Sequence, residues 1–290
     1  MPADDEDLVG ELQTATVAKG ETLADVARRS GIGYDELAAA NPGLDHWLPK
    51  EGAKVVLPTQ HVLPPGPRNG IVINVPEMRL YYYLPGPEPT VMTFPIAVGR
   101  EDWPTPVTET KVAERVKDPV WVPPADIKAE HAARDDPLPA KVPPGPDNPL
   151  GPLALRLALP MHLIHGTNKL FGIGMRVTHG CIRLYPEHMQ ELFELVTVDT
   201  PVRVVDVPFK AGWKDGNLWL QATSINGPQP AWDALPQLFL GAARGRPLPP
   251  VDWNASYAAL KQARGIPVPV ARSNVEAPVT MLRPAPPPRS

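Results

Sequence analysis

The sequence predicts a mostly β protein with a small α+β unit at its N-terminus and a small accessory unit at its C-terminus. Apolar and β-branched segments bounded by turn residues recur at 70–75, 79–84, 91–98 and 108–116, as in consecutive strands. The chain also has 41 prolines in 290 residues, and proline interrupts helices and favours extended backbone. Residues 12–58 show a strand, helix, helix, strand order of their own.

Composition excludes some classes of protein. A hydrophobic content of 43% is ordinary for a soluble protein, and a net charge of −4 gives no broad basic surface for nucleic acid. No run reaches the roughly 18 apolar residues of a membrane span. Residues 1–7 lack the basic start and apolar centre of a signal peptide, so we expect a cytoplasmic protein or an exported one whose leader has been removed. The single cysteine fits export, since it has no partner for an internal disulfide.

The N-terminal unit is predicted to be a compact βααβ module at 12–58. Thr22 is placed to cap the first helix, with Asp25 three residues later as its capping-box partner. The predicted elements are a strand at 12–17, a helix after Thr22, a helix at 34–40 and a strand at 54–57. A proline-rich joint at 61–67 follows, which we expect to act as a short, stiff spacer.

The central domain is predicted to span 68–207. Besides the strands named above, it contains a Tyr81 to Tyr83 run expected to pack rings on both faces of its strand. Nine prolines exclude long helices from most of 118–151, and such a long irregular stretch inside a domain is usually functional or disordered. Pro186 fits the first turn of a helix, and a strand at 200–206 closes the domain.

The C-terminal part is predicted to be an accessory subdomain at 208–270. It begins with a hairpin at 212–222 around Asp215-Gly216 and continues with helices near 231–240 and 253–264. The proline-rich end at 271–290 is expected to be a disordered tail.

Chemistry concentrates between His162 and Arg183, a stretch that contains the only cysteine and three of the seven histidines. A thiol is a good nucleophile as its thiolate, and a nearby imidazole is the usual means of forming it. His179 lies two residues before Cys181, and His165 lies sixteen before it, far enough to come from a neighbouring strand. If the segment is extended, the side chains of His179, Cys181 and Arg183 point into one cleft, because alternate residues of a strand share a face.

Strand alternation also places Leu163 and His165 on one face and His162 on the other. Glycines flank the key residues and allow close backbone approach. Amides around Gly180 and its neighbour Cys181 can form an oxyanion hole for an acyl-transfer intermediate.

Two alternatives to this chemistry stay open. A lone cysteine is often a small buried hydrophobe, and a single histidine is often structural. The four residues His162, His165, His179 and Cys181 can instead ligate zinc. Their spacings match no structural zinc pattern, and no carboxylate lies in the stretch to support such ligands, so we expect neither a metal nor another cofactor.

Three segments resemble the motif of the YkuD-type L,D-transpeptidases, in which a histidine precedes an [S/T]-H-G-C-x-[R/N] run at diagnostic spacing. They are His165-Gly166-Thr167, Phe171-Gly172-Ile173-Gly174 and Thr178-His179-Gly180-Cys181-Ile182-Arg183. IVINVPEMRLYYY and PPGPDNPLG are similar to the ErfK/YbiS-like subgroup, which attaches Braun lipoprotein to peptidoglycan. The resemblance implies a β-sandwich catalytic domain at 68–207 with a lid at 118–151.

For the site, the resemblance implies that Cys181 is the nucleophile, His165 its base and the Gly166 carbonyl the group that orients the imidazole. His179 and Gly180 would complete the catalytic set. Substrate-binding roles would fall to Thr178, Arg183, Trp121 and Asn148, the last two from the lid, although Trp121 can equally be a packing anchor.

KGETLADVARR and AANPGLD resemble a LysM module, which implies binding to the N-acetylglucosamine of glycan strands through loops at 20–22 and 41–44. The alternative is a docking domain that binds no sugar.

The implied reaction is a ping-pong transfer on peptidoglycan tetrapeptide stems, with release of D-alanine. The acyl acceptor would be a second stem, giving a 3→3 cross-link, or a lysine of an outer-membrane lipoprotein. The family further implies periplasmic location, a part in cell-wall biogenesis and cell shape, and acylation by carbapenems. Hydrolysis by the same site, as in a carboxypeptidase or an enzyme that detaches wall-linked protein, is the main alternative, and a pure wall-binding module and a zinc hydrolase are the others.

Overall fold

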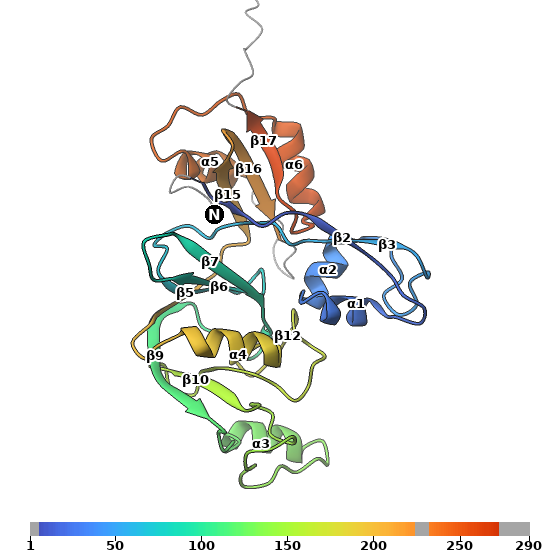
Figure 1. Cartoon of the computed structure of the whole chain (residues 1–290), viewed down its shortest axis with the longest axis vertical. Helices are drawn as coiled ribbons and strands as arrows, with labels where there is room; N and C mark the ends of the chain where they lie inside the picture. The colour runs from blue at the N-terminus through green and yellow to red at the C-terminus, as the bar shows by residue number, and fades with distance from the viewer. Residues whose placement is uncertain (1–5, 224–231, 273–290) are drawn as a thin grey trace, which may run out of the picture.

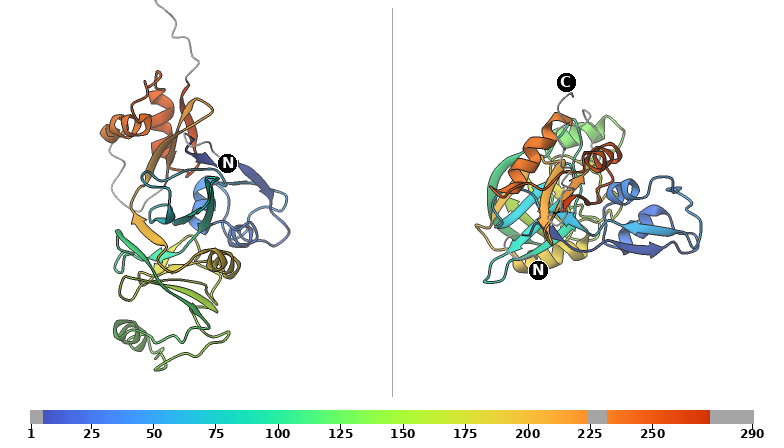
Figure 2. Two further views of the ribbon diagram at one scale, coloured as in Figure 1. Left: turned by 60° about the vertical axis from the view of Figure 1, so that its left-hand side comes forward. Right: turned by 90° about the horizontal axis from the view of Figure 1, so that it is seen from above.

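The structure is a computed structural model that describes residues 6–223 and 232–272. Three parts follow one another along the chain (Figure 1). The N-terminal module lies to one side of the central domain, the C-terminal subdomain covers one end of that domain, and helix α3 (Ala125–Ala132) lies at the opposite end (Figures 1 and 2). Helix α3 belongs to the segment 118–151 that was expected to form a lid, and we keep the name lid for this segment. The mostly β class predicted from the sequence is confirmed.

The N-terminal module has the predicted βααβ order. Strand β2 (Gln13–Thr16) pairs antiparallel with β3 (Lys54–Leu57), and helices α1 (Leu23–Arg29) and α2 (Tyr34–Ala40) lie between them in sequence. The capping box is present: the Thr22 hydroxyl accepts from the Asp25 amide, and the Asp25 carboxylate accepts from the Thr22 amide.

The predicted spacer at 61–67 is instead partly built into the fold. Strand β4 (His61–Val62) pairs antiparallel with β1 (Leu8–Val9), and both of its side chains are buried. The apolar side chains of Val62 and Leu63 explain the difference, because they gain more from burial in the junction than from exposure in a linker.

The central domain is one eight-stranded sheet in the order β13-β11-β10-β9-β14-β5-β6-β7. Strand β9 joins its two halves, since residues 108–111 pair with β14 and residues 112–117 pair with β10. Both halves and helix α4 contribute to one hydrophobic core, which includes Ile73, Leu80, Leu155, Ile182 and Leu192.

The strands predicted at 70–75, 79–84, 91–98, 108–116 and 200–206 are confirmed within three residues at each end, as β5 (Gly70–Asn74), β6 (Arg79–Leu84), β7 (Thr90–Pro95), β9 (Thr108–Lys117) and β14 (Pro201–Val205). The other strands of the domain are β8 (Val98–Gly99), β10 (Leu153–Leu157), β11 (Leu163–His165), β12 (Arg176–Thr178) and β13 (Ile182–Arg183). Helix α4 (Pro186–Leu195) begins at the predicted proline. Tyrosines are buried on both faces of β6: Tyr82 lies in the main core, and Tyr81 and Tyr83 lie in a second cluster.

The lid at 118–151 is less irregular than its prolines suggest. Helix α3 (Ala125–Ala132) fits between Pro124 and Pro137, and Trp121 and Val142 form an antiparallel bridge through two backbone hydrogen bonds of 2.9 and 2.8 Å.

The C-terminal subdomain contains the predicted hairpin, β15 (Phe209–Lys214) and β16 (Asn217–Ala222), with both turn residues at positive φ. Helices α5 (Leu235–Ala243) and α6 (Trp253–Gln262) follow, and the predicted start of the first at residue 231 lies outside the described residues. Strand β17 (Val268–Arg272) was not predicted, and it corrects the start of the tail, because Ala271 is buried and pairs with Leu218. Residues 273–290 lie outside the described part.

None of the helices in residues 6–223 and 232–272 has the length and apolar content needed to cross a membrane.

Candidate active site

A cleft of about 840 Å³ lies between the end of the central sheet and the lid. Its floor and one wall come from the predicted motif, with Cys181, His165, His179 and Arg183 all lining it. The structure thus brings these four side chains to one cleft, although residues 179–181 are not in a strand. His162 lines the cleft too, although strand alternation predicted the opposite face. It precedes β11 and follows Met161, which has a positive φ of 68°, so it does not obey strand alternation.

Two short parallel strands bring the two ends of the motif together. Ile164 of β11 pairs with Ile182 of β13, and His165 pairs with Arg183. Residues eighteen apart in the sequence thus become neighbours. Cys181 sits just before β13, at the sheet edge that opens on the cleft.

His165 is buried, with 4% of its surface exposed. Its Nδ1 lies 2.6 Å from the Gly166 carbonyl oxygen. Since a carbonyl can only accept, Nδ1 carries the proton and Nε2 remains able to take one. Burial, with the Arg183 charge adding to it, lowers the pKa of His165 to about 3. The imidazole is therefore neutral at pH 7, as a general base must be.

Cys181 is the free cysteine of the chain and is partly exposed at the cleft. Its Sγ donates to the Met161 carbonyl at 3.5 Å. Burial raises the pKa of the thiol, while the Leu163 amide and the Arg183 guanidinium act in the opposite direction. The resting pair is thus a neutral thiol and a neutral imidazole, so proton transfer must accompany attack on a substrate.

Two threonine hydroxyls hold the backbone around the thiol. Thr178 donates to the Cys181 carbonyl at 2.6 Å. Thr105 donates to the Gly180 carbonyl at 2.9 Å and accepts from the Gly99 amide at 2.9 Å. Thr178 was predicted to bind substrate, but its side chain is 2% exposed and its hydroxyl is used in this way, so the structure assigns it to the loop.

The same contacts orient the amides of the loop. In a trans peptide the carbonyl and the following amide point in opposite directions, so fixing the Gly180 carbonyl also fixes the Cys181 N–H. Gly180 has φ of +93°, which a side chain would strain. Within residues 6–223 and 232–272, no group accepts from the Gly180 or Cys181 amide. These amides are available to an oxyanion.

His179 connects the motif to the lid. Its Nε2 lies 2.8 Å from Glu130 Oε2 on α3, and its ring meets Trp103 edge-on at 4.7 Å. Glu130 also accepts two hydrogen bonds from Arg100, at 2.9 and 2.6 Å, and pairs with Arg134 at 2.7 Å. Hydrogen bonds from Arg100 and His179 lower the pKa of Glu130 to about 2.

The two predicted lid contacts have different positions. Trp121 lines the cleft and also forms the bridge within the lid, so it can both contact a peptide and anchor packing. Asn148 is fully buried. Its amide nitrogen donates to the Pro119 carbonyl at 2.7 Å, and its oxygen accepts from the Leu150 amide at 2.9 Å. Its placement contradicts a direct contact with substrate, because the lid itself uses this side chain.

Arg183 lies beside the thiol with its charge uncompensated. Its Nε is buried without a hydrogen-bond partner, and no carboxylate of the described residues pairs with it. Burial lowers the pKa of its guanidinium. A buried cation without a partner is costly, which favours an anionic group at this end of the cleft.

The alternative of a zinc site would need several His, Cys, Asp or Glu side chains close together. No group of three or more His, Cys, Asp or Glu side chains among residues 6–223 and 232–272 is arranged to hold a metal. His162 lies instead with its Nδ1 2.8 Å from the Pro160 carbonyl.

The loops expected to bind sugar are used mainly within the N-terminal module. Asn41 is buried and bonds to the carbonyls of Leu37 and Val56 at 2.9 and 2.7 Å. Trp47 and Leu48, just beyond the predicted loop, are large hydrophobic side chains exposed at this edge.

Comparison with known proteins shows the family of the chain. Residues 68–204 match the YkuD L,D-transpeptidase catalytic domain, and residues 15–58 match the LysM domain. The Escherichia coli K12 protein named "Probable L,D-transpeptidase ErfK/SrfK" is 38% identical over 287 residues, 93% of this chain and 90% of that protein. This chain belongs to the L,D-transpeptidases. The E. coli K12 protein named "Probable L,D-transpeptidase YbiS" is 44% identical over 225 residues, 76% of this chain and 73% of that protein.

A solved structure described as the Ldtfm-avibactam carbamoyl enzyme is 22% identical, with a TM-score of 0.37 over 53% of this chain and 55% of that one. The predicted family, with its LysM module, is thus confirmed by the sequence matches. Sequence reasoning missed three residues that hold this L,D-transpeptidase site together: Thr105, Arg100 and Glu130. None lies in the motif, and only the helix inside the lid brings Glu130 to His179.

Proposed function

We propose that this L,D-transpeptidase uses Cys181 as its nucleophile on the tetrapeptide stems of peptidoglycan. The observation that supports the proposal is that a thiol and a neutral imidazole, whose Nδ1 is fixed by the Gly166 carbonyl, line the same cleft. The base on β11 pairs with Arg183 on β13, and the thiol comes just before β13.

In the first half-reaction, Cys181 Sγ attacks the carbonyl carbon of the third residue of the stem, and the thiol proton passes to His165 Nε2. The amides of Gly180 and Cys181 stabilise the oxyanion. The intermediate collapses to a thioester as His165 returns the proton to the leaving amine, and D-alanine departs. Arg183 binds a donor carboxylate, because a guanidinium matches that group with two parallel hydrogen bonds.

In the second half-reaction, an amine attacks the thioester carbonyl and gives a proton to His165, which passes it to the departing thiolate. The acceptor is the side-chain amine of a second stem or a lysine of an outer-membrane lipoprotein. Both proposed substrates favour a periplasmic location, and the LysM match supports a role at the glycan of the wall. The lipoprotein acceptor is supported by the resemblance of IVINVPEMRLYYY and PPGPDNPLG to the lipoprotein-attaching subgroup.

Arg183→Ala tests the donor assignment. A hydrogen bond to a charged group contributes about 1.5–3 kcal/mol, so kcat/KM for the tetrapeptide should fall by roughly 10- to 100-fold. The matched control is Arg156→Ala, which removes a second arginine from the same cleft, one that already pairs with Glu114 at 3.1 Å. The control should change donor use far less. Acylation of Arg183→Ala at the wild-type rate contradicts the proposed contact.

Product analysis tests the acceptor. With a lysine-ended lipoprotein peptide present, we expect the acyl group of the Cys181 adduct to move to that peptide. Release to water alone, with the peptide left unmodified, identifies a carboxypeptidase. Transfer only to a second muropeptide identifies a cross-linking enzyme.

A further inference from the structure

A second cavity, of about 520 Å³, lies where the three parts of the chain meet. We call it the junction cavity. Helix α2 forms one wall, the turn before β6 and strand β12 form another, and the C-terminal subdomain closes the third. The residues on which its chemistry depends are Asp35, Ala38, His46, Met78, Arg176 and Thr223. Ligand sites occur preferentially at such domain boundaries.

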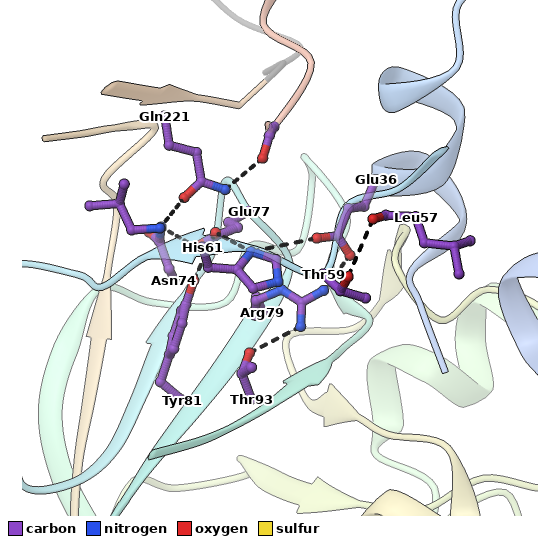
Figure 3. A network of polar contacts seen from close by, with 12 residues as sticks. Glu36, Leu57, Thr59, His61, Asn74, Glu77, Arg79, Tyr81, Thr93 and Gln221 are labelled. Atoms are coloured by element: carbon purple, nitrogen blue, oxygen red, sulfur yellow. Dashed lines mark hydrogen bonds and ion pairs between the residues drawn. The ribbon is translucent and has the colours of Figure 1, made fainter. Parts of the chain in front are cut away.

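A network of buried charges makes this junction rigid (Figure 3). Glu36 of α2 pairs with Arg79 of β6, and Glu77 pairs with Lys210 of β15 at 2.6 Å. All four side chains are almost completely buried. A buried ion loses its hydration, and a close partner of opposite charge must offset that loss. The two ion pairs therefore hold α2, β6 and β15 in fixed positions relative to one another. Glu36 also lines the junction cavity, which therefore has a preformed wall.

Gln221 extends the same network to the third wall. Its Oε1 accepts from the Val62 amide at 2.8 Å, and its Nε2 donates to the Gly265 carbonyl at 2.6 Å. Gly265 lines the cavity. These two hydrogen bonds of Gln221 thus hold the C-terminal subdomain at the edge of the junction cavity, and Figure 3 shows Gln221 beside the network.

The junction cavity also borders the active site. The amides of Tyr34 and Asp35 donate to the carbonyls of Ile173 and Gly174, at 3.0 and 3.2 Å, within the catalytic motif. Strand β12 then separates the two hollows: Arg176 lines the junction cavity and Thr178 lines the catalytic cleft. Two residues of a strand span about 6.6 Å, so the two hollows lie close together on either side of this strand.

The groups around the cavity favour a neutral, hydroxyl-rich ligand. Asp35, Arg176 and His46 offer acceptors and donors, and burial raises the pKa of Asp35 while Arg176 and His46 oppose the shift. The Thr223 hydroxyl is buried, and no residue of the described chain bonds to it. Ala38 and Met78 supply apolar surface.

The charge balance disfavours a peptide stem in this cavity. A stem carries several carboxylates, whereas the cavity presents the two carboxylates of Asp35 and Glu36 against the single guanidinium of Arg176. The Glu36 charge is already matched by Arg79. No surplus of positive charge remains for an anionic ligand, so a sugar fits better than the peptide attached to it.

We propose that the junction cavity binds the neutral N-acetylated sugar that carries the donor stem, while the stem itself occupies the catalytic cleft. This assignment rests on the proposed function. It makes the LysM helix α2 and the C-terminal subdomain parts of one donor subsite, separate from the exposed loop edge at Trp47.

Binding of a neutral N-acetylglucosamine tetramer, measured by calorimetry on the full chain with Cys181→Ala, tests the site without any turnover. Adding Arg176→Ala or Asp35→Asn should weaken binding at least tenfold. The matched control is Arg272→Ala, an exposed arginine of the same chain, which should leave affinity unchanged. Trp47→Ala tests whether the sugar binds instead at the exposed loop edge of the N-terminal module. Loss of binding in Trp47→Ala but not in Arg176→Ala overturns the proposal, as does no measurable binding at all.

A kinetic comparison links the cavity to the reaction. Disaccharide tetrapeptide should acylate Cys181 with a kcat/KM about tenfold above that of the free tetrapeptide, and Arg176→Ala should bring that ratio close to one. An unchanged ratio in Arg176→Ala refutes the sugar subsite. Failure of both donors to acylate the wild-type chain refutes the proposed function instead, and the binding experiment still decides whether the cavity holds sugar.

Discussion

Thr105 offers a sharp test of how the thiol loop is built, because it lies outside the motif and touches no substrate. Its hydroxyl donates to the Gly180 carbonyl and accepts from the Gly99 amide, and its side chain is 4% exposed. Thr105→Val keeps the shape and removes the hydroxyl. Both backbone groups then lose their partner in a buried place, at about 1–3 kcal/mol each.

The expected effect on catalysis follows from the orientation of the Cys181 amide. Loss of an oxyanion donor altogether costs about 10²–10³ in kcat. In Thr105→Val the donor remains but loses its alignment, so we expect the acylation rate to fall by roughly 10- to 100-fold. Thermal unfolding should also shift downward, because the same two hydrogen bonds stabilise the 99–105 turn.

The assay is time-resolved mass spectrometry of Cys181 acylation by a tetrapeptide donor, with melting temperature measured in parallel. Thr105→Ser is the control, since it keeps the hydroxyl and should retain most of the rate. The reasoning is refuted if Thr105→Val acylates within twofold of the wild type while Thr105→Ser does not differ from it.

Two further predictions concern the junction and the lid. Burial alone would raise the pKa of Glu77, but Lys210 and His61 hold it well below its usual value of 4.5. The ionised Glu77 therefore stabilises the folded chain above pH 4.5, and this stabilisation is lost as the pH falls. Lys210→Met should cost about 3–5 kcal/mol in urea unfolding at pH 7, and a loss below 1 kcal/mol argues against a buried pair. Glu130→Gln should speed amide hydrogen exchange in α3, because it removes the charge that pairs with His179. Unchanged exchange shows that the contact between Glu130 and His179 does not hold the lid in place.

Elements with local signals were predictable. The capping box of α1, the proline start of α4 and the Asp215-Gly216 hairpin each depend on neighbouring residues, and the structure has all three. Strand alternation predicted a common cleft for the motif, but residues 179–181 lie between β12 and β13 and Gly180 has a positive φ, so the turn and not alternation brings these side chains to the cleft.

Long-range pairing explains what was missed. The last two residues of β17, Ala271 and Arg272, were assigned to the tail, because the strand character of this segment depends on pairing with β16, which lies far away in sequence. His61 was read as linker because nothing near it in sequence shows that Glu77 lies 3.6 Å away. Asn148 was assigned to substrate because an asparagine in a loop does not reveal whether its amide faces the cleft or the loop itself.

The most direct test of the account is the intact mass of the purified chain after incubation with disaccharide tetrapeptide. We predict an adduct equal to the donor minus D-alanine, located on Cys181 by peptide mapping and absent from Cys181→Ala. An adduct on another residue, or D-alanine release that persists in Cys181→Ala, contradicts the assignment of Cys181 as the nucleophile.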